Sequence, residues 1–352
     1  APEFHSNNLD KKIGHKREPS PPQGDSNANY KAVVFLFLFG GLDSFNVLVP
    51  DPGCDLYNEY KDARGSVHLS HNEIKKIDAS GQGQPCDFFG VHNKIPLFEQ
   101  LYNSGEGIFL ANTGHLHKPV TKKTYARETT TSLFSHNTME QEAYVIDAYK
   151  EKDGTGVLGR MLDMMESKNF SVGSIAMNGN SVVLAGATDR FIDVIAANGP
   201  VIIRRQKFSG WGNDLNDIKS YIEELNSESK ANSGLFANHW SQNLVNTWAK
   251  SDDLNSVLNG AVLKKAFPGG FGTNFKTISK FIVTHAIRKK TRETFYVRLG
   301  GFDAHTGGKS NLNQKLPEVN RALTSFYLEM KEQDLLDSVT VVVGSEFGRT
   351  LS

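Results

Sequence analysis

The sequence predicts an α/β fold: a doubly wound, mostly parallel sheet flanked by helices. Three hydrophobic runs indicate buried strands, and each stops at a small polar cluster that contains glycine. From residue 31 onward such runs alternate with helix-like stretches, a pattern typical of parallel strands joined by crossover helices. The three runs are VVFLFLFGGLDS at 33–44, FYVRLGGFDAH at 295–305 and VTVVVGSEFGRT at 339–350.

The first thirty residues differ from the rest. Residues 1–30 are polar and Pro-rich and have no hydrophobic period, so we expect a flexible tail in which APEF resembles a cloning remnant. Residues 31–352 show no linker-like composition and are expected to form one domain. The first strand, Val33–Phe39, is apolar on both faces, as expected in the middle of a sheet that helices cover on each side.

The other elements follow from hydrophobic period and turn residues. Before residue 250 we expect a turn-rich excursion (50–92), a helix (94–102), a strand (107–111), a helix within 133–149, a helix (156–167), two short strands (171–176 and 181–185) and two amphipathic helices (214–226 and 233–248). A helix (275–288), a strand (294–299), a helix (312–333) and a strand (338–344) then complete an α-β-α-β series.

Composition excludes several classes of function. The 39 acidic residues balance 39 lysines and arginines, so bulk charge favours neither nucleic acid nor an anionic membrane. The longest apolar run is too short to cross a bilayer, and we expect no membrane insertion. No G-x-G-x-x-G follows the first strand, which argues against a nucleotide-binding oxidoreductase.

Two cysteines bear on the compartment. Cys54 and Cys86 lie among turn residues and form either one disulfide or two separate thiols. An Asn-Phe-Ser sequon begins at Asn169. Together these features suggest a secreted or extracytoplasmic protein.

Acidic groups follow all three strands. Asp43 follows the first strand, Asp303 and His305 the second, and Glu346 the third. Carboxyl ends of parallel strands meet at one edge of a sheet, where open α/β folds bind ligands. Carboxylates and imidazoles are ligands of divalent metals such as zinc, calcium or manganese. We therefore expect these four residues to hold a metal that assists hydrolysis.

Each of these groups also has a purely structural interpretation. Asp43 can cap the following turn, and Asp303 can do the same beside a surface His305. Glu346 and Arg349 can form a plain salt bridge, although an acid and a guanidinium are also suited to a metal and a tetrahedral oxyanion.

Ser135 is the candidate nucleophile. A hydroxyl at the start of a helix lies in a positive partial field that favours an alkoxide and an incoming phosphate or sulfate, and His136 beside it can carry a proton or bind a metal. The structural alternative is an N-cap serine followed by a first-turn histidine. Asn112, His115 and His117 follow the expected strand 107–111 and are candidates for substrate binding.

Five motifs resemble those of a known family. GGLDSFNVLVP, ANTGHLHKPVTK, LFSHN, GGFDAH and VVVGSEFGRT occur in the order and spacing of the DUF1501 family, which is related to the sulfatases and placed in the alkaline-phosphatase-like superfamily. The resemblance runs from about residue 31 to the last residue. It implies an alkaline-phosphatase-like fold with Ser135 at the position of the nucleophilic hydroxyl or formylglycine. The metal-binding positions would be those of Asp43, Asp303, His305 and Glu346.

The sequence also departs from that family. Members continue past SEFGRT into a histidine-containing segment resembling DHGWGG, so the resemblance implies that this chain is either a fragment or naturally short, and that at least one expected ligand is absent. The leading hypothesis is a metal-dependent hydrolase of phosphate or sulfate esters, acting on a small molecule or a glycan. The alternative is a non-catalytic extracellular or surface protein that retains the fold. Nothing in the sequence identifies a protein partner.

Overall fold

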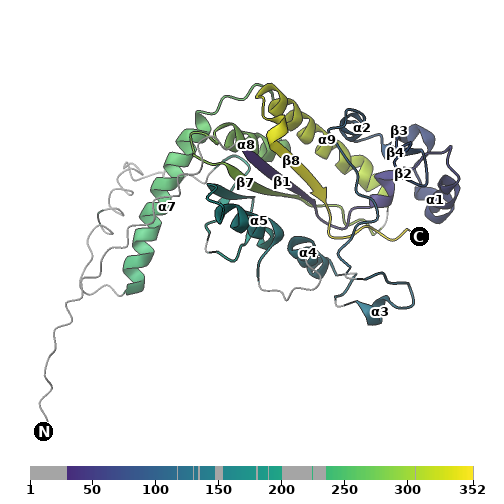
Figure 1. Cartoon of the computed structure of the whole chain (residues 1–352), viewed down its shortest axis with the longest axis horizontal. Coiled ribbons are helices and arrows are strands. Elements are labelled where there is room, and N and C mark those ends of the chain that lie inside the picture. Colours follow the sequence, from purple (N-terminus) through teal and green to yellow (C-terminus); the bar gives the residue numbers. More distant parts are fainter. Residues whose placement is uncertain are drawn as a thin grey trace, which may run out of the picture.

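Five parallel strands form the central sheet of the chain, seen in a computed structural model (Figure 1). The structure describes residues 30–116, 118–129, 131–133, 135–146, 154–179, 181–188, 190–199, 224, 235–305 and 307–351. The strand order is β6-β5-β7-β1-β8. The strands are β1 (Lys31–Leu38), β5 (Val172–Met177), β6 (Asp193–Ile195), β7 (Arg292–Leu299) and β8 (Val339–Gly344). The predicted α/β class and mostly parallel sheet are confirmed.

Strand β1 lies between β7 and β8 and is buried on both faces. Val34 and Leu36 belong to the larger apolar cluster, whereas Phe35 and Phe37 belong to a second cluster on the opposite face. This alternation follows from the period of two in a strand. Because each fully buried side chain of this kind contributes about 1.5–3 kcal/mol, β1 anchors both layers of helices.

Helices cover both faces of the sheet. On one side α8 (Gly272–Val283) packs against α9 (Gly308–Glu332), and their apolar residues join the larger cluster. On the other side, α4 (His136–Val145) and α5 (Val157–Glu166) join the second cluster (Figure 1). Helix α7 (Leu235–Asn259) contacts α8. The N-terminus of α4 is thereby placed near the carboxyl edge of the sheet.

The turn-rich excursion carries a small structure of its own. Strands β2 (Leu48–Pro50), β4 (Phe88–His92) and β3 (Ile74–Asp78) form an antiparallel sheet in the order β2-β4-β3. Helix α1 (Leu56–Arg64) contacts β2, and α2 (Pro96–Asn103) contacts β3 and β4. A disulfide joins Cys54 to Cys86.

The remaining helices of the described residues are short. They are α3 (Tyr125–Glu128) and the 3-10 helices η1 (Ser44–Asn46), η2 (Gly65–Val67), η3 (His71–Glu73), η4 (Val182–Leu184) and η5 (Leu336–Ser338).

Two predicted strands are wrong. Residues 107–111 form no strand: Ile108 and Leu110 are exposed, and only Phe109 between them packs, against Phe98 and Tyr102 of α2. The apolar residues at 107–111 therefore hold a loop in place through the Phe109 ring alone. Residues 181–185 contain η4 instead, because both Val183 and Leu184 turn into the core, which a strand with alternating faces would not allow.

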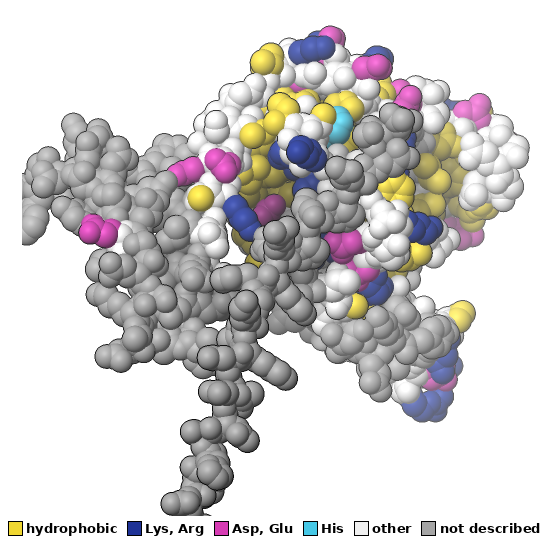
Figure 2. Space-filling model, turned by 60° about the vertical axis from the view of Figure 1, so that its left-hand side comes forward, with side chains coloured by type: hydrophobic (Ala, Val, Ile, Leu, Met, Phe, Trp, Pro, Cys, Tyr) yellow, Lys and Arg dark blue, Asp and Glu magenta, His cyan; other side chains and the backbone are white. Residues whose placement is uncertain are grey.

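Other expectations fall outside the described residues. These are the tail, apart from its last residue, and the helix 214–226 except residue 224. No helix among the described residues has both the length and the apolarity to span a bilayer. On the face shown in Figure 2, acidic and basic side chains of the described residues are interspersed, and neither sign forms a continuous field there.

Candidate functional site

Three strand ends meet where the sequence placed the acids. Leu38 of β1 is in register with Leu299 of β7, and Phe37 pairs with Gly344 of β8. The segments that follow these strands therefore begin at the same edge of the sheet.

Gly40 allows two of these segments to touch. Its φ of +122° is one that side chains rarely adopt, and a Cβ there would lie 2.3 Å from the Asp303 nitrogen. The Phe302 amide in turn donates to the Phe39 carbonyl at 3.2 Å. The loop after β7 is thus held directly against the loop after β1, which brings Asp303 to the cluster.

Glu346 is fully buried. Its Oε1 accepts a hydrogen bond from the Gly40 amide at 2.8 Å and lies 2.7 Å from His136 Nδ1. Its Oε2 lies 2.9 Å from the Ser345 hydroxyl, whose single hydrogen is shared with the Leu38 carbonyl at 2.7 Å. The carboxylate therefore orients its neighbours and has no oxygen that faces solvent.

His136 is the group that Glu346 orients. The imidazole, on the first residue of α4, lies between the rings of Phe39 and Phe347, with centroids 5.7 and 4.9 Å away. Because a carboxylate can only accept, the hydrogen between them is on Nδ1, which leaves the lone pair of neutral His136 on Nε2. That nitrogen lies 3.5 Å from Asp303 Oδ1 at the half-exposed side of the cluster.

Asp303 is the exposed acid of the cluster. One oxygen is shared by an ion pair with Arg349 and by His305 Nε2 at 3.0 Å. The hydrogen bond from Arg349 holds the pKa of Asp303 below its usual range. Arg349 also donates to the carbonyls of Gly40 and Gly41, so its guanidinium is fixed at this edge.

Asp43 faces a different partner. It is buried with Arg64, the last residue of α1, in an ion pair whose side chains are 6% and 7% exposed. Burial raises the pKa of Asp43, and Arg64 opposes that shift. No local signal in the sequence links Arg64 to Asp43, so sequence reasoning missed this pair.

Ser135 caps α4. Its oxygen accepts from the Thr138 amide at 3.5 Å and from the Thr138 hydroxyl at 3.1 Å. Both bonds use lone pairs of the serine, so its own hydrogen remains available to a base. The cap and a nucleophilic role are compatible.

The three residues expected to bind substrate do not lie together at the cluster in the described part of the chain. His115 lies against the backbone of Ser345, beside the cluster, and burial lowers its pKa. Asn112 is exposed, has a φ of 56°, and follows no strand, so the strand end on which its assignment rested does not exist. His117 lies outside the described residues.

The donor groups can be tested against the divalent metal that the resemblance implies. Arg64 holds one oxygen of Asp43, and Arg349 occupies one oxygen of Asp303. Glu346 Oε1 is taken by Gly40 and His136, and Oε2 lies against the Ser345 hydroxyl. Asp43 Oδ1 alone among these carboxylate oxygens is buried without a hydrogen-bond partner in the structure. Across the described stretches of the chain, no three His, Cys, Asp or Glu side chains are arranged to hold a metal ion. In this arrangement the residues do not fit a metal, and arginines supply the positive charge.

Fold and site define an α/β protein with a polar cluster at the carboxyl edge of a parallel sheet. The family described as protein of unknown function (DUF1501) matches residues 30–352, and the chain belongs to it. No curated protein and no solved structure matches the chain.

Proposed function

We propose that this protein hydrolyses phosphate or sulfate esters at the cluster around His136. The observation that carries the proposal is the 2.7 Å contact between His136 Nδ1 and the buried Glu346 carboxylate. A carboxylate in this position orients an imidazole and stabilises its protonated form, which a general base requires. The kinship with sulfatases and the alkaline-phosphatase-like superfamily is part of the same proposal.

Ser135 is the proposed nucleophile. Its oxygen attacks phosphorus or sulfur while His136 Nε2 takes the hydroxyl proton, and the protonated His136 then gives that proton to the ester oxygen, which leaves as the alcohol. In the second half-reaction, water gives a proton to His136 and attacks phosphorus or sulfur, and His136 returns that proton to Ser135 as phosphate or sulfate is released. The start of α4 favours the negative charge that gathers there.

Arg349 is the proposed anion-binding group. The carbonyls of Gly40 and Gly41 fix its guanidinium before any substrate arrives, so little reorganisation is needed. Its planar donors suit the oxygens of a tetrahedral group. His305, 79% exposed beside Asp303, is positioned to contact the same anion from the solvent side.

The experiment is hydrolysis of 4-nitrophenyl phosphate and 4-nitrophenyl sulfate by the wild type, Ser135→Ala and His136→Ala. Exposed His71→Ala is the matched control. We expect each site variant to lose about 10²- to 10⁴-fold in kcat/KM, the usual contribution of a general base, with the control unchanged. Equal turnover in all four proteins would remove both residues from the reaction.

Divalent ions form a second arm of this experiment. The assays are repeated with EDTA and with added zinc, calcium or manganese. Activity that requires an ion would contradict the arginine-based centre. Activity that persists in EDTA supports the arginine-based centre.

A second candidate is a non-catalytic extracellular or surface protein that keeps the fold. Two ion pairs favour it, Arg64–Asp43 and Arg349–Asp303, because each arginine neutralises a carboxylate that a catalytic metal would need as a ligand. The Cys54–Cys86 disulfide suits an oxidising compartment. A folded wild type that hydrolyses neither ester under any ion condition would support this candidate.

A further inference from the structure

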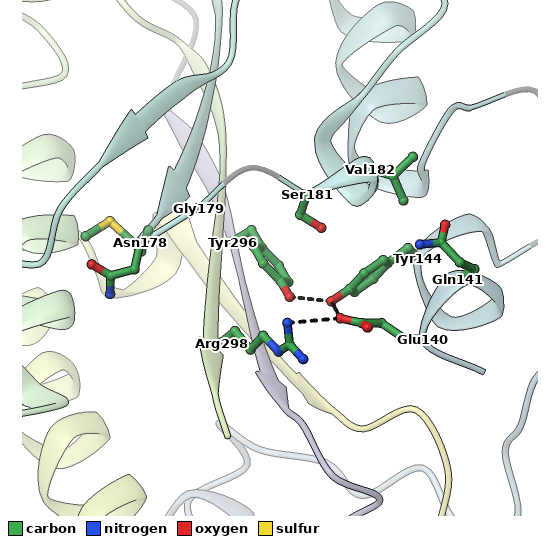
Figure 3. A pocket seen from close by; sticks show the side chains of 10 residues that line it. Glu140, Gln141, Tyr144, Asn178, Gly179, Ser181, Val182, Tyr296 and Arg298 are labelled. Carbon is green, nitrogen blue, oxygen red and sulfur yellow. Dashed lines mark hydrogen bonds and ion pairs between the residues drawn. The ribbon is translucent and has the colours of Figure 1, made fainter. Parts of the chain in front are cut away.

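A cavity of about 220 Å³ lies beside the cluster, between α4, β7 and the segment that joins β5 to η4. Its walls include Glu140 and Tyr144 from α4 and Tyr296 and Arg298 from β7 (Figure 3). Sites for drug-sized ligands are usually about 300–1,000 Å³. This cavity therefore has room for a single small unit.

A relay of hydrogen bonds runs along one wall. The Tyr144 hydroxyl donates to Glu140 Oε1 and is also hydrogen-bonded to the Tyr296 hydroxyl (Figure 3). Because Tyr144 has a single hydrogen and gives it to Glu140, the hydrogen in the second bond comes from Tyr296. The relay fixes the direction of each hydroxyl before a ligand enters.

The cavity is polar but carries no net charge. Glu140 and Arg298 face each other at 3.4 Å and balance. Burial raises the pKa of Tyr296 to about 12 and that of Tyr144 further still, so both hydroxyls are neutral at physiological pH. The balanced pair gives the site no preference for a ligand charge of either sign. A neutral ligand with several hydroxyls would find donors on Arg298 and acceptors on Glu140 and the tyrosine oxygens.

Hydrogen-bonding capacity is left over for such a ligand. Within the described residues, only Oε1 of the Glu140 carboxylate has protein partners, and Oε2 has none. The Arg298 side chain is 40% exposed and lies over the Phe39 ring, 3.5 Å from its centroid, which holds its donors in a fixed plane. Asn178 is turned away in Figure 3 and instead bonds to Asn274, so it supports the wall.

The cavity adjoins the proposed catalytic cluster. Glu140 lies one turn beyond His136 on the same helix, and residues four apart share one face. The Phe39 ring contacts Arg298 and also lies 5.7 Å from the His136 ring. A ligand in the cavity could therefore extend past Phe39 toward His136.

We propose that this cavity binds one sugar unit, through the hydroxyls of Tyr144 and Tyr296 and the Glu140–Arg298 pair. In the ester substrate this unit is the alcohol part, which places the ester oxygen toward His136; only this last step rests on the proposed function. Binding of the sugar itself needs no reaction.

The test is ligand-observed NMR titration of the full chain with methyl β-D-glucopyranoside, methyl β-D-galactopyranoside and N-acetylglucosamine. We expect saturable binding of at least one probe. Tyr296→Phe and Glu140→Gln each remove hydrogen-bonding capacity and should weaken it about three- to tenfold. Tyr102→Phe, which removes an exposed hydroxyl remote from the cavity, is the matched control and should bind as the wild type does.

His136→Ala separates this inference from the proposed function. It should lower kcat/KM for ester hydrolysis about 10²- to 10⁴-fold and leave sugar binding unchanged. Binding without hydrolysis in the wild type upholds the sugar site and removes the hydrolase. No saturable binding of any probe to the folded wild type, or equal binding by Tyr296→Phe, Glu140→Gln and wild type, overturns the sugar site whatever the hydrolysis assays give.

Discussion

Glu346 and His136, which are 210 positions apart in the sequence, are joined by a 2.7 Å contact between a fully buried carboxylate and a half-buried imidazole. The contact links the end of β8 to the first residue of α4. A structural capping role for either residue would not require the other.

Glu346→Gln tests the chemical role of this contact. Glutamine keeps the size and one acceptor oxygen but removes the charge that stabilises a protonated His136. We expect kcat/KM for the aryl ester to fall about 10²- to 10⁴-fold with the protein still folded. Circular dichroism checks the fold, and retention of wild-type kcat/KM would contradict the role.

Arg64→Met tests whether the Asp43–Arg64 pair is structural. The variant leaves a buried carboxylate without its cation, which typically lowers the free energy of unfolding by about 3–5 kcal/mol. Arg127→Met, at a side chain that is 80% exposed, is the control and should stay within about 0.5 kcal/mol of wild type. Urea denaturation measures both.

Adding Asp43→Asn to Arg64→Met removes the unpaired charge. The double variant should therefore be more stable than Arg64→Met alone. A double variant that is the less stable of the two would mean that Asp43 has a stabilising role independent of Arg64.

The disulfide between Cys54 and Cys86 should add stability. It closes a loop of 32 residues, for which the chain-entropy relation gives about 3–4 kcal/mol at 25 °C. Cys54→Ser/Cys86→Ser should lower the free energy of unfolding by about that amount. Reductant should reproduce the loss in the wild type and have no effect on the double variant; wild-type stability that is insensitive to reductant would contradict this.

His92 should make stability depend on pH. Burial lowers its pKa to about 4, whereas an unfolded histidine titrates near 6.5. Between those values the unfolded state binds a proton that the folded state does not, so stability falls as pH falls from about 6.5 to 4, by up to about 3 kcal/mol. Unfolding measured across this range checks the slope.

His92→Asn should flatten that slope. The asparagine oxygen can take the place of His92 Nδ1, which accepts from the Lys94 amide at 3.1 Å. Exposed His71→Asn is the control and should keep the wild-type slope. Hydrogen bonds from Lys309 and Ser70 outweigh burial and lower the pKa of Glu73 to about 2. Its contribution is lost as pH falls from about 4.5 to 2, so the two windows overlap only between about 4 and 4.5. Equal slopes in both variants would contradict the assignment to His92.

The sequence was sufficient for four of the five strands of the central sheet, and the short edge strand β6 was not predicted. The runs that became β1, β7 and β8 are long, apolar and bounded by glycine, so their assignment did not depend on tertiary context. The strand predicted at 107–111 is absent because the pattern of five residues is the same for a strand and for a loop that one buried ring, Phe109, holds in place.

The location of the candidate site could be predicted from the sequence, but the partner of each acidic residue could not. That Asp303, His305 and Glu346 gather follows from parallel strands ending at one edge. Which acid faces solvent depends on how the chain packs after each strand. Glu346 turns inward to His136, and Asp43 pairs with Arg64 of α1, the helix that packs on the antiparallel sheet. Such contacts leave no periodic or local mark in a single sequence.

A double-variant cycle on His136 and Glu346 tests the central claim most directly. It compares kcat/KM for 4-nitrophenyl phosphate or sulfate hydrolysis in wild type, His136→Ala, Glu346→Gln and the double variant. If the two residues act as one unit, the double variant should be no slower than His136→Ala alone, because Glu346 acts only through that imidazole. Losses that multiply in the double variant, or single variants as active as wild type, would contradict the account.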